Sequence, residues 1–124
     1  NGLKVQCKSF GFKHGADTEA DIVFDVRCLP NPFYEDELKE KTGIDRAVRD
    51  FIMSHEESRE FEKRVFDFID YAMPLYVREG KSQLVIAFGC TGGRHRSVAF
   101  AESLYKHLEQ QGYRVSSIHR DIYK

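Results

Sequence analysis

The sequence predicts an α/β domain: a single layered unit with a largely parallel sheet flanked by helices and a ligand site at the carboxyl ends of the strands. Three observations lead to this prediction. Short apolar runs of strand length alternate with longer stretches of helical periodicity. The chain has 124 residues, enough for one hydrophobic core but not two. Its 41% hydrophobic and 13% aromatic residues are typical of folded globular proteins.

Four stretches have the pattern of strands. Residues 3–10 alternate apolar and polar side chains, which predicts a half-buried strand. Residues 22–26 and 84–88 are apolar runs, and 84–88 is the more uniformly apolar, as expected of a buried strand. Residues 113–118 give the last strand.

Helical segments fill the spaces between the predicted strands. The first is a short charged helix over residues 35–41, stopped by Gly43, and the second is capped by Asp45 and runs to Met53. The third is a long helix that begins at a capping box in residues 54–57 and is stopped by Gly80. The fourth covers residues 97–111 and is followed by Gly112. The long helix carries an apolar stripe of helical spacing, which predicts core packing: Phe61, Val65, Phe68, Ile69, Ala72, Met73 and Tyr76. Pro74 should kink this helix near its end.

The strongest functional signal is the stretch of residues 89–98, Gly-Cys-Thr-Gly-Gly-Arg-His-Arg-Ser-Val. It lies between a predicted strand and a predicted helix, where backbone N–H groups and the helix dipole favour an anion. Gly92 and Gly93 allow the backbone to approach a ligand closely. The Arg-His-Arg-Ser that follows adds cations and a hydroxyl, so the stretch predicts a phosphate site.

Polar residues also follow the other predicted strands: Lys13 and His14, Asp25 and Arg27, and His119 and Arg120. If the strands are parallel, these clusters meet the glycine loop at one edge of the sheet. A carboxylate in an apolar strand is costly without a partner, and Arg27 shares the strand face of Asp25. Asp25 is therefore open to two interpretations, a permanent partner of Arg27 or a ligand-binding group.

Residues 90–97 also fit the C-x5-R-[ST] pattern of cysteine-dependent phosphatases. In that alternative, Cys90 is the nucleophile, Arg96 and the loop amides hold the phosphoryl oxygens, and Ser97 assists the departing thiolate. Asp25 or Asp17 would protonate the leaving group.

Four motifs stand in a fixed order: residues 10–15, residues 25–32, residues 90–98, and the His119-Arg120 pair. With them the chain resembles, over essentially its whole length, the C-terminal domain of the RNase adapter protein family (RapZ and YvcJ-like proteins). The resemblance implies that residues 1–124 form a single sugar-phosphate-sensing domain. It also implies that the family's N-terminal P-loop domain, which binds ATP or GTP, is absent from this chain, since no G-x-x-x-x-G-K-[ST] occurs.

The implied function is regulatory rather than catalytic: binding of an amino-sugar phosphate, glucosamine-6-phosphate. In enterobacterial members the domain also binds small RNAs and presents them to an endoribonuclease. The expected ligand-binding set combines the resemblance with the strand-end clusters: Cys90, Thr91, Gly92, Gly93, His95, Arg96, Ser97, Asp25, Arg27, Asn31, His14, Lys13, His119 and Arg120. Asp25 or Asn31 would receive the sugar's ammonium or hydroxyls.

Composition limits the remaining possibilities. The formal net charge of -1 gives no general attraction to nucleic acid or membrane, and no apolar run approaches the ~20 residues of a membrane span. The three cysteines have no metal-ligand spacing, so we expect no metal and a reducing, cytoplasmic location. The start lacks a methionine and any signal-peptide pattern, and we expect the chain to be a fragment of a longer protein. Separately, we expect it to form a homo-oligomer. A protein-interaction module with a vestigial pocket is the third possibility.

Overall fold

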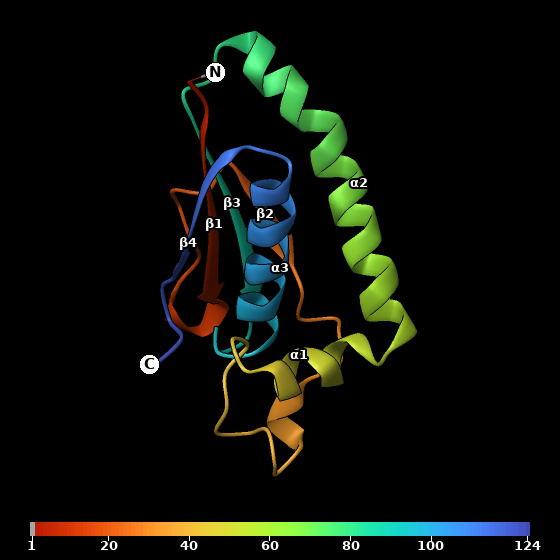
Figure 1. Ribbon diagram of the computed structural model, residues 1–124. Helices are drawn as coiled ribbons and strands as arrows, with labels where there is room; N and C mark the ends of the chain where they lie inside the picture. The colour runs from red at the N-terminus through yellow and green to blue at the C-terminus, as the bar shows by residue number, and fades with distance from the viewer. Residues whose placement is uncertain (1) are drawn as a thin grey trace.

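A computed structural model describes residues 2–124 and shows a four-stranded sheet that is parallel throughout (Figure 1). The strands are β1 (Lys4–Gly11), β2 (Ile22–Asp25), β3 (Gln83–Cys90) and β4 (Arg114–His119), and they lie in the order β2-β3-β1-β4. The predicted α/β class and parallel sheet are confirmed. The carboxyl ends of all four strands therefore point to the same edge.

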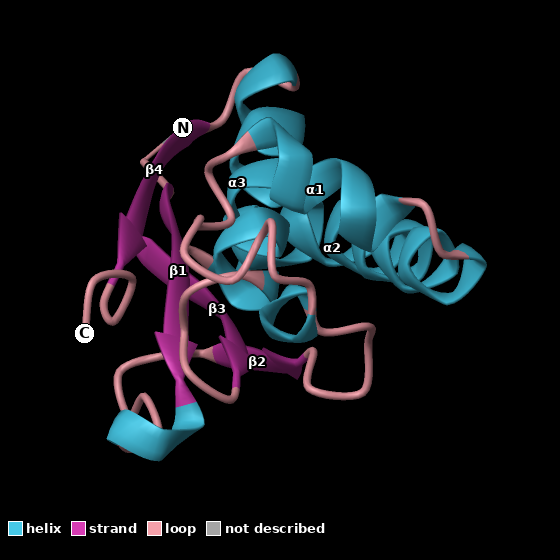
Figure 2. Cartoon of the chain, turned by 90° about the horizontal axis from the view of Figure 1, so that it is seen from below, coloured by secondary structure: helices cyan, strands magenta, loops and turns pink. Residues whose placement is uncertain are grey.

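The three α-helices, α1 (Arg46–Met53), α2 (Glu56–Glu79) and α3 (Arg96–Gln110), lie on the same side of the sheet (Figure 2). Two short 3-10 turns, η1 (Phe12–His14) and η2 (Pro32–Tyr34), follow β1 and β2. The core forms between the sheet and the helices. Its largest fully buried side chains on the central strands and α3 are Leu84, Ile86, Phe88, Phe100, Leu104 and Leu108.

Helix α3 is the element that connects the core to the strand ends. Val98, Ala101, Leu104 and Leu108 recur at helical spacing and are all 0% exposed, and burying each large apolar side chain contributes about 1.5–3 kcal/mol. Gly112, at φ +89°, follows the helix as predicted. Because this face is fixed against β1 and β3, the amino end of α3 is held next to the end of β3.

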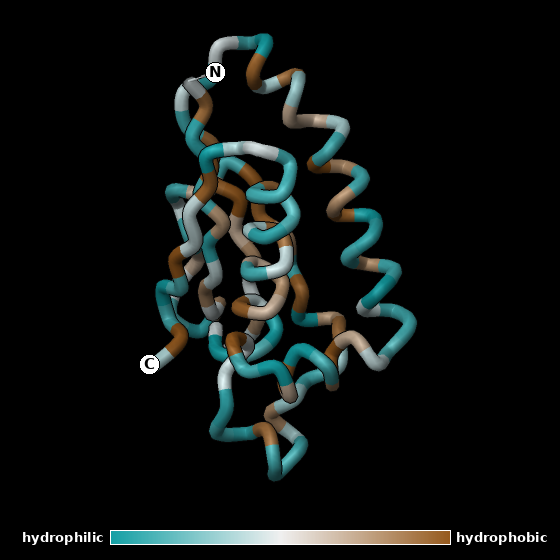
Figure 3. The backbone as a smooth tube through the Cα atoms, in the orientation of Figure 1, coloured by the Kyte–Doolittle hydropathy of each residue, from teal (hydrophilic) through white to brown (hydrophobic). Residues whose placement is uncertain are grey.

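Helix α2 is long and only one side of it is covered. Val65, Ile69, Ala72 and Met73 of the predicted stripe are buried, whereas Phe68 is 48% exposed, and Figure 3 shows apolar residues recurring among hydrophilic ones along this helix. One local prediction needs correction. The helix is preceded by His55 at the N-cap, without a side-chain cap bond, because the hydroxyl of Ser54 donates instead to the carbonyl of Phe51. Pro74 lies inside the helix, which continues to Glu79 before Gly80 ends it, as predicted.

The predicted helix over residues 35–41 is wrong: the structure has turns there. The backbone carbonyls of residues 38–41, the last four of the predicted helix, accept hydrogen bonds from side chains of the loop before α3. Arg94 donates to the carbonyls of Glu40 and Lys41, and His95 Nε2 lies 3.2 Å from the carbonyls of Leu38 and Lys39. These tertiary bonds hold the segment in its turn conformation against the loop before α3.

Strand β1 is more buried than its alternating pattern predicts. Lys8 and Ser9 are only 7% and 0% exposed. Lys8 Nζ lies 2.7 Å from Asp17 Oδ2 and 3.1 Å from Glu19 Oε1, in the loop that follows η1. Burial alone would lower the pKa of Lys8, but these two carboxylates outweigh it and raise the pKa. This loop therefore covers part of the sheet face that the helices leave open.

Candidate functional site: a phosphate-type loop at the strand ends

The loop between β3 and α3 is shaped by two close glycine contacts. Gly93 has φ +81°, and a Cβ there would lie 2.6 Å from Gly11 N. A Cβ on Gly11 would collide with the backbone of Gly92 and Gly93. The Gly11 amide donates to Asp121 Oδ2 at 2.8 Å. The end of β1 therefore packs directly on the loop, and both positions require glycine.

A cavity of about 390 Å³ opens over this loop. The side chains and backbone that line it come from four parts of the chain: Lys13, Asn31, Phe33, Tyr34, Lys39, Glu40, Cys90, Thr91, Gly92, Arg94, His95, Arg96 and Lys124. Five of these residues are lysine or arginine, and Glu40 is the only acidic side chain among the described lining residues. The charge of the lining favours an anion.

Arg96 is the most informative residue of the cavity. It is 4% exposed, and its Nη1 donates to the carbonyls of Arg27 (2.8 Å) and Leu29 (3.0 Å). On the opposite edge of the guanidinium, Nη2 lies 3.5 Å from Thr91 Oγ1, and Nε has no acceptor among residues 2–124. A buried N–H without a partner is costly. The Nε–Nη2 edge is the fork that binds carboxylate or phosphate oxygens in pairs.

Cys90 lies at the base of the cavity and is 3% exposed. Its thiol donates to Ser97 Oγ at 3.1 Å, and its sulfur accepts from the Gly93 amide at 3.3 Å. Ser97 and Gly93 thus support the loop from below and are not among the residues that line the cavity. The loop contributes the thiol of Cys90 and the hydroxyl of Thr91 to the cavity lining.

His95 positions neighbouring backbone rather than supplying a positive charge. It is 5% exposed, and burial lowers its pKa despite the hydrogen bonds to the carbonyls of Leu38 and Lys39. A neutral ring that donates from Nε2 satisfies these carbonyls. His95 and Arg94 together hold the segment that carries Lys39 and Glu40 against the cavity.

Asp25 and Arg27 form the ion pair that their spacing predicts. Arg27 Nη2 lies 2.7 Å from Asp25 Oδ2, and Nε bonds both carboxylate oxygens. Both side chains are about half exposed, at 48% and 47%, and neither lines the cavity. Bonds from Arg27 are the main cause that lowers the pKa of Asp25. The Arg27 guanidinium also stacks over the Phe12 ring at 3.8 Å.

The remaining predicted residues lie apart from the cavity lining, except Lys13 and Asn31. His14 is exposed. His119 bridges Ser9 Oγ and Glu102 Oε2, at 2.7 Å each. Arg120 Nη2 pairs with Asp121 Oδ2 at 2.9 Å and also bonds the carbonyl of Gly15. Asn31 accepts from the Phe33 amide, so its amide nitrogen is the group left for a ligand.

Several lining residues are not identified by the sequence analysis: Phe33, Tyr34, Lys39, Glu40 and Lys124. Four of them lie in the segment 33–40, whose charged residues resemble an exposed helix. The Pro-Asn-Pro stretch before this segment was the sequence signal that could have indicated a turn there, because prolines restrict where the chain can turn.

The cavity belongs to a chain with clear relatives. The family model described as the RapZ C-terminal domain matches residues 3–123. A nucleotide-binding protein of Caldanaerobacter subterraneus subsp. tengcongensis is 56% identical over 121 residues, and one of Alkaliphilus oremlandii is 55% identical over 121 residues. Each alignment covers 98% of this chain but only 43% and 42% of the relative, respectively. The relatives are thus more than twice as long as the chain. No helix within residues 2–124 is long and apolar enough to cross a membrane. By its match over nearly every residue, the chain belongs to the RapZ C-terminal domain family.

Proposed function

We propose that this domain is a non-catalytic sensor that binds an amino-sugar phosphate such as glucosamine-6-phosphate. The observation that carries the proposal is the buried Arg96, one of five basic residues that line the cavity: its Nε has no acceptor within residues 2–124, and its Nη2 has only a long contact, at 3.5 Å, with Thr91 Oγ1. A phosphate group supplies paired oxygens for this edge and for the amides of the loop. It also neutralises the positive charge of the lining.

The rest of the cavity suits the sugar half of such a ligand. A volume of about 390 Å³ is at the small end of ligand pockets and favours a monosaccharide over a larger ligand. Asn31 offers an amide, and Glu40 offers a carboxylate that could meet an ammonium group. Tyr34, which is 78% exposed, lies at the same cavity and could cover the sugar ring.

The amine is the feature that distinguishes this ligand from a neutral sugar phosphate. Asp25 is one candidate to receive it, but its oxygens already bind Arg27. Glu40 is the other candidate. Its side chain is 85% exposed, and its contact with Arg94, at 3.8 Å, is longer than the 2.7 Å contact between Arg27 and Asp25. We therefore expect Glu40→Gln to reduce affinity for the amino sugar more than Asp25→Asn does.

Calorimetry tests the proposal with glucosamine-6-phosphate, glucose-6-phosphate and inorganic phosphate. The carboxylate that meets the amine should, when neutralised, cost the amino sugar about 1–3 kcal/mol more than its hydroxyl analogue. Equal losses for both sugars in both variants would mean that neither carboxylate reads the amine. Failure of all three ligands to bind would reject the sensor function.

The phosphatase alternative has one supporting observation, the thiol of Cys90 within hydrogen-bonding distance of Ser97 at the cavity base. Its weak point is the acid. Asp25 is held ionised by Arg27, and neither Asp25 nor Asp17, which pairs with Lys8, lines the cavity. We expect no turnover of p-nitrophenyl phosphate and nearly unchanged sugar-phosphate affinity in Cys90→Ser. Turnover that disappears in Cys90→Ser would establish the phosphatase instead.

Nucleotide and RNA binding are proposals for the longer protein. The relatives are named nucleotide-binding proteins, and more than half of their length lies outside the matched part. We propose that ATP or GTP binds in that remaining part and that this domain reports the sugar phosphate to it, to small RNA and an endoribonuclease, or to other regulatory proteins. Comparing nucleotide binding by the longer protein and by this domain tests the first point.

A further inference from the structure

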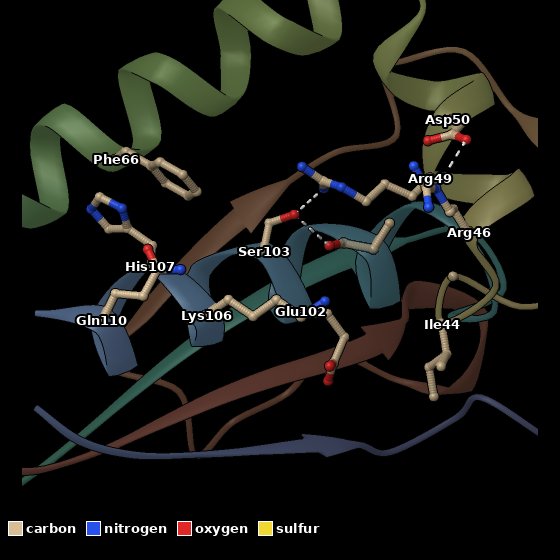
Figure 4. Close-up of a pocket in the computed structure, with 12 residues that line it drawn as sticks. Ile44, Arg46, Arg49, Asp50, Phe66, Glu102, Ser103, Lys106, His107 and Gln110 are labelled. Carbon is tan, nitrogen blue, oxygen red and sulfur yellow. Dashed lines mark hydrogen bonds and ion pairs between the residues drawn. The ribbon is translucent and has the colours of Figure 1, made fainter. Parts of the chain in front are cut away.

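A second cavity, of about 520 Å³, lies between α1, α2 and α3. Figure 4 shows the side chains that surround it, with Arg46 and Arg49 from α1, Phe66 from α2, and Lys106 and Gln110 from α3. None of these residues lines the cavity of about 390 Å³ over the loop between β3 and α3, which we call the phosphate cavity. We call this cavity the helix groove.

The groups that the helix groove presents are mainly hydrogen-bond donors. Its two carboxylates are already engaged. Asp50 lies 3.7 Å from Arg46, and Glu102 Oε2 lies 2.7 Å from His119 Nε2. Figure 4 shows Glu102 pointing from α3 towards the sheet. Lys106 forms no ion pair within residues 2–124, so its ammonium is available to a partner.

The same groove has an apolar part. Ile44 is 57% exposed, and Phe66 is partly buried beside the ring of His107, with 4.2 Å between the two ring centroids. Cations next to an exposed aliphatic side chain complement a polypeptide that carries both carboxylates and apolar residues. A nucleic acid fits less well, because it offers no aliphatic side chain to meet the exposed Ile44.

We propose that the helix groove docks a short acidic segment of a partner protein, with glutamate or aspartate meeting Arg46 and Lys106 and an apolar side chain meeting Ile44. The phosphate cavity regulates this docking through a shared wall. Lys39 and Glu40 line the phosphate cavity, whereas Gly43 and Ile44 line the groove a few residues later.

The shared wall has little freedom to move independently of the loop before α3. The Gly43 amide donates to the Arg94 carbonyl at 2.9 Å, and a Cβ on Gly43 would collide with the His95 carbonyl. The Arg94 side chain holds the carbonyls of Glu40 and Lys41. A phosphate that attracts Arg94 competes with these bonds, so occupancy of one cavity changes the support of the other. This coupling rests on the proposed function.

Fluorescence anisotropy with a labelled short peptide of alternating glutamate and leucine tests the docking. The expected result is that the double variant Arg46→Glu/Lys106→Glu weakens binding at least tenfold, because two attractive charges become repulsive. The matched control is Arg64→Glu/Arg78→Glu, which makes the same charge change on α2 away from the groove. Thermal unfolding verifies that both variants are folded.

Three outcomes would overturn the docking proposal. The first is an equal loss of peptide affinity in both double variants. The second is a loss of peptide binding in the phosphate-cavity variant Lys39→Glu but not in the groove variant. The third is that a lysine–leucine peptide or a short oligouridylate binds as tightly as the acidic peptide, or more tightly. The last result would identify a different class of partner.

Inorganic phosphate tests the coupling. Saturating phosphate should change the Kd of the peptide at least threefold, and the peptide should change the affinity for phosphate by the same factor, since coupling is reciprocal. Phosphate that binds by calorimetry without altering the peptide Kd would refute the coupling and leave the sensor function intact. Phosphate that fails to bind would refute both, while the docking result would stand separately.

Discussion

Replacing Arg96 by Lys tests whether its free edge is an anion fork. Lysine keeps the positive charge but offers one ammonium in place of the planar Nε–Nη2 pair. A charge-assisted hydrogen bond contributes about 1.5–3 kcal/mol. Loss of one of the two bonds to a phosphate should therefore weaken the Kd roughly 10- to 150-fold. Arg96→Ala removes both bonds and should weaken binding at least as much.

The same substitution also affects folding, and the two effects need to be separated. Nη1 of Arg96 holds the carbonyls of Arg27 and Leu29, so both variants should lower the free energy of unfolding by about 1–3 kcal/mol. Calorimetry with inorganic phosphate, below the unfolding temperature of each variant, measures binding by the folded protein alone. Arg78→Lys, on the exposed end of α2, is the control. Folded Arg96 variants whose affinity stays within twofold of the wild type would refute the anion fork.

The other two predictions concern the loop and its wall. Gly93→Ala should lower the free energy of unfolding by at least about 1–2 kcal/mol, because φ is +81° and a Cβ would lie 2.6 Å from Gly11 N. Gly92→Ala, where a Cβ meets nothing within 4 Å, should leave stability unchanged in urea unfolding but weaken phosphate binding; similar stability losses at both positions would contradict this. Burial lowers the pKa of His95, so the unfolded state binds its proton more readily, and stability should fall as pH drops through about 6.5. His95→Gln should flatten this dependence in urea unfolding between pH 5 and 8, and an unchanged slope would refute the assignment.

The sequence predicts the sheet well because its strands combine hydrophobic runs with clear glycine boundaries. Strand β3 and helix α3 lie within two residues of their predicted bounds, since β3 is almost entirely buried and the buried residues of α3 recur at helical spacing. The segment 35–41 is different. Its charged residues have helical propensity, but its carbonyls bind Arg94 and His95, more than 50 residues away in the chain. Local patterns carry no information about such partners.

The candidate site shows the same division. The loop over Cys90 to Arg96 could be located from the strand-glycine-helix order, because that order by itself brings amides and cations together. Which strand-end clusters reach the cavity depends on side-chain direction. Lys13 lines the cavity, while His14 next to it is exposed, and no spacing rule distinguishes the two.

The fixed order of the four motifs has a physical reason in this arrangement. The first supplies Gly11, on which the loop rests, and the second supplies the Arg27 and Leu29 carbonyls that orient Arg96. The last motif acts through its neighbour Asp121. Burial would raise the pKa of Asp121, but bonds from Arg120, the Gly11 amide and Lys124 hold it well below its usual range. An ionised, fully buried carboxylate thus fixes Gly11 under the loop. Gly11, Arg27 and Leu29 therefore position the anion site without lining it, so a change in one motif can disturb the cavity through another.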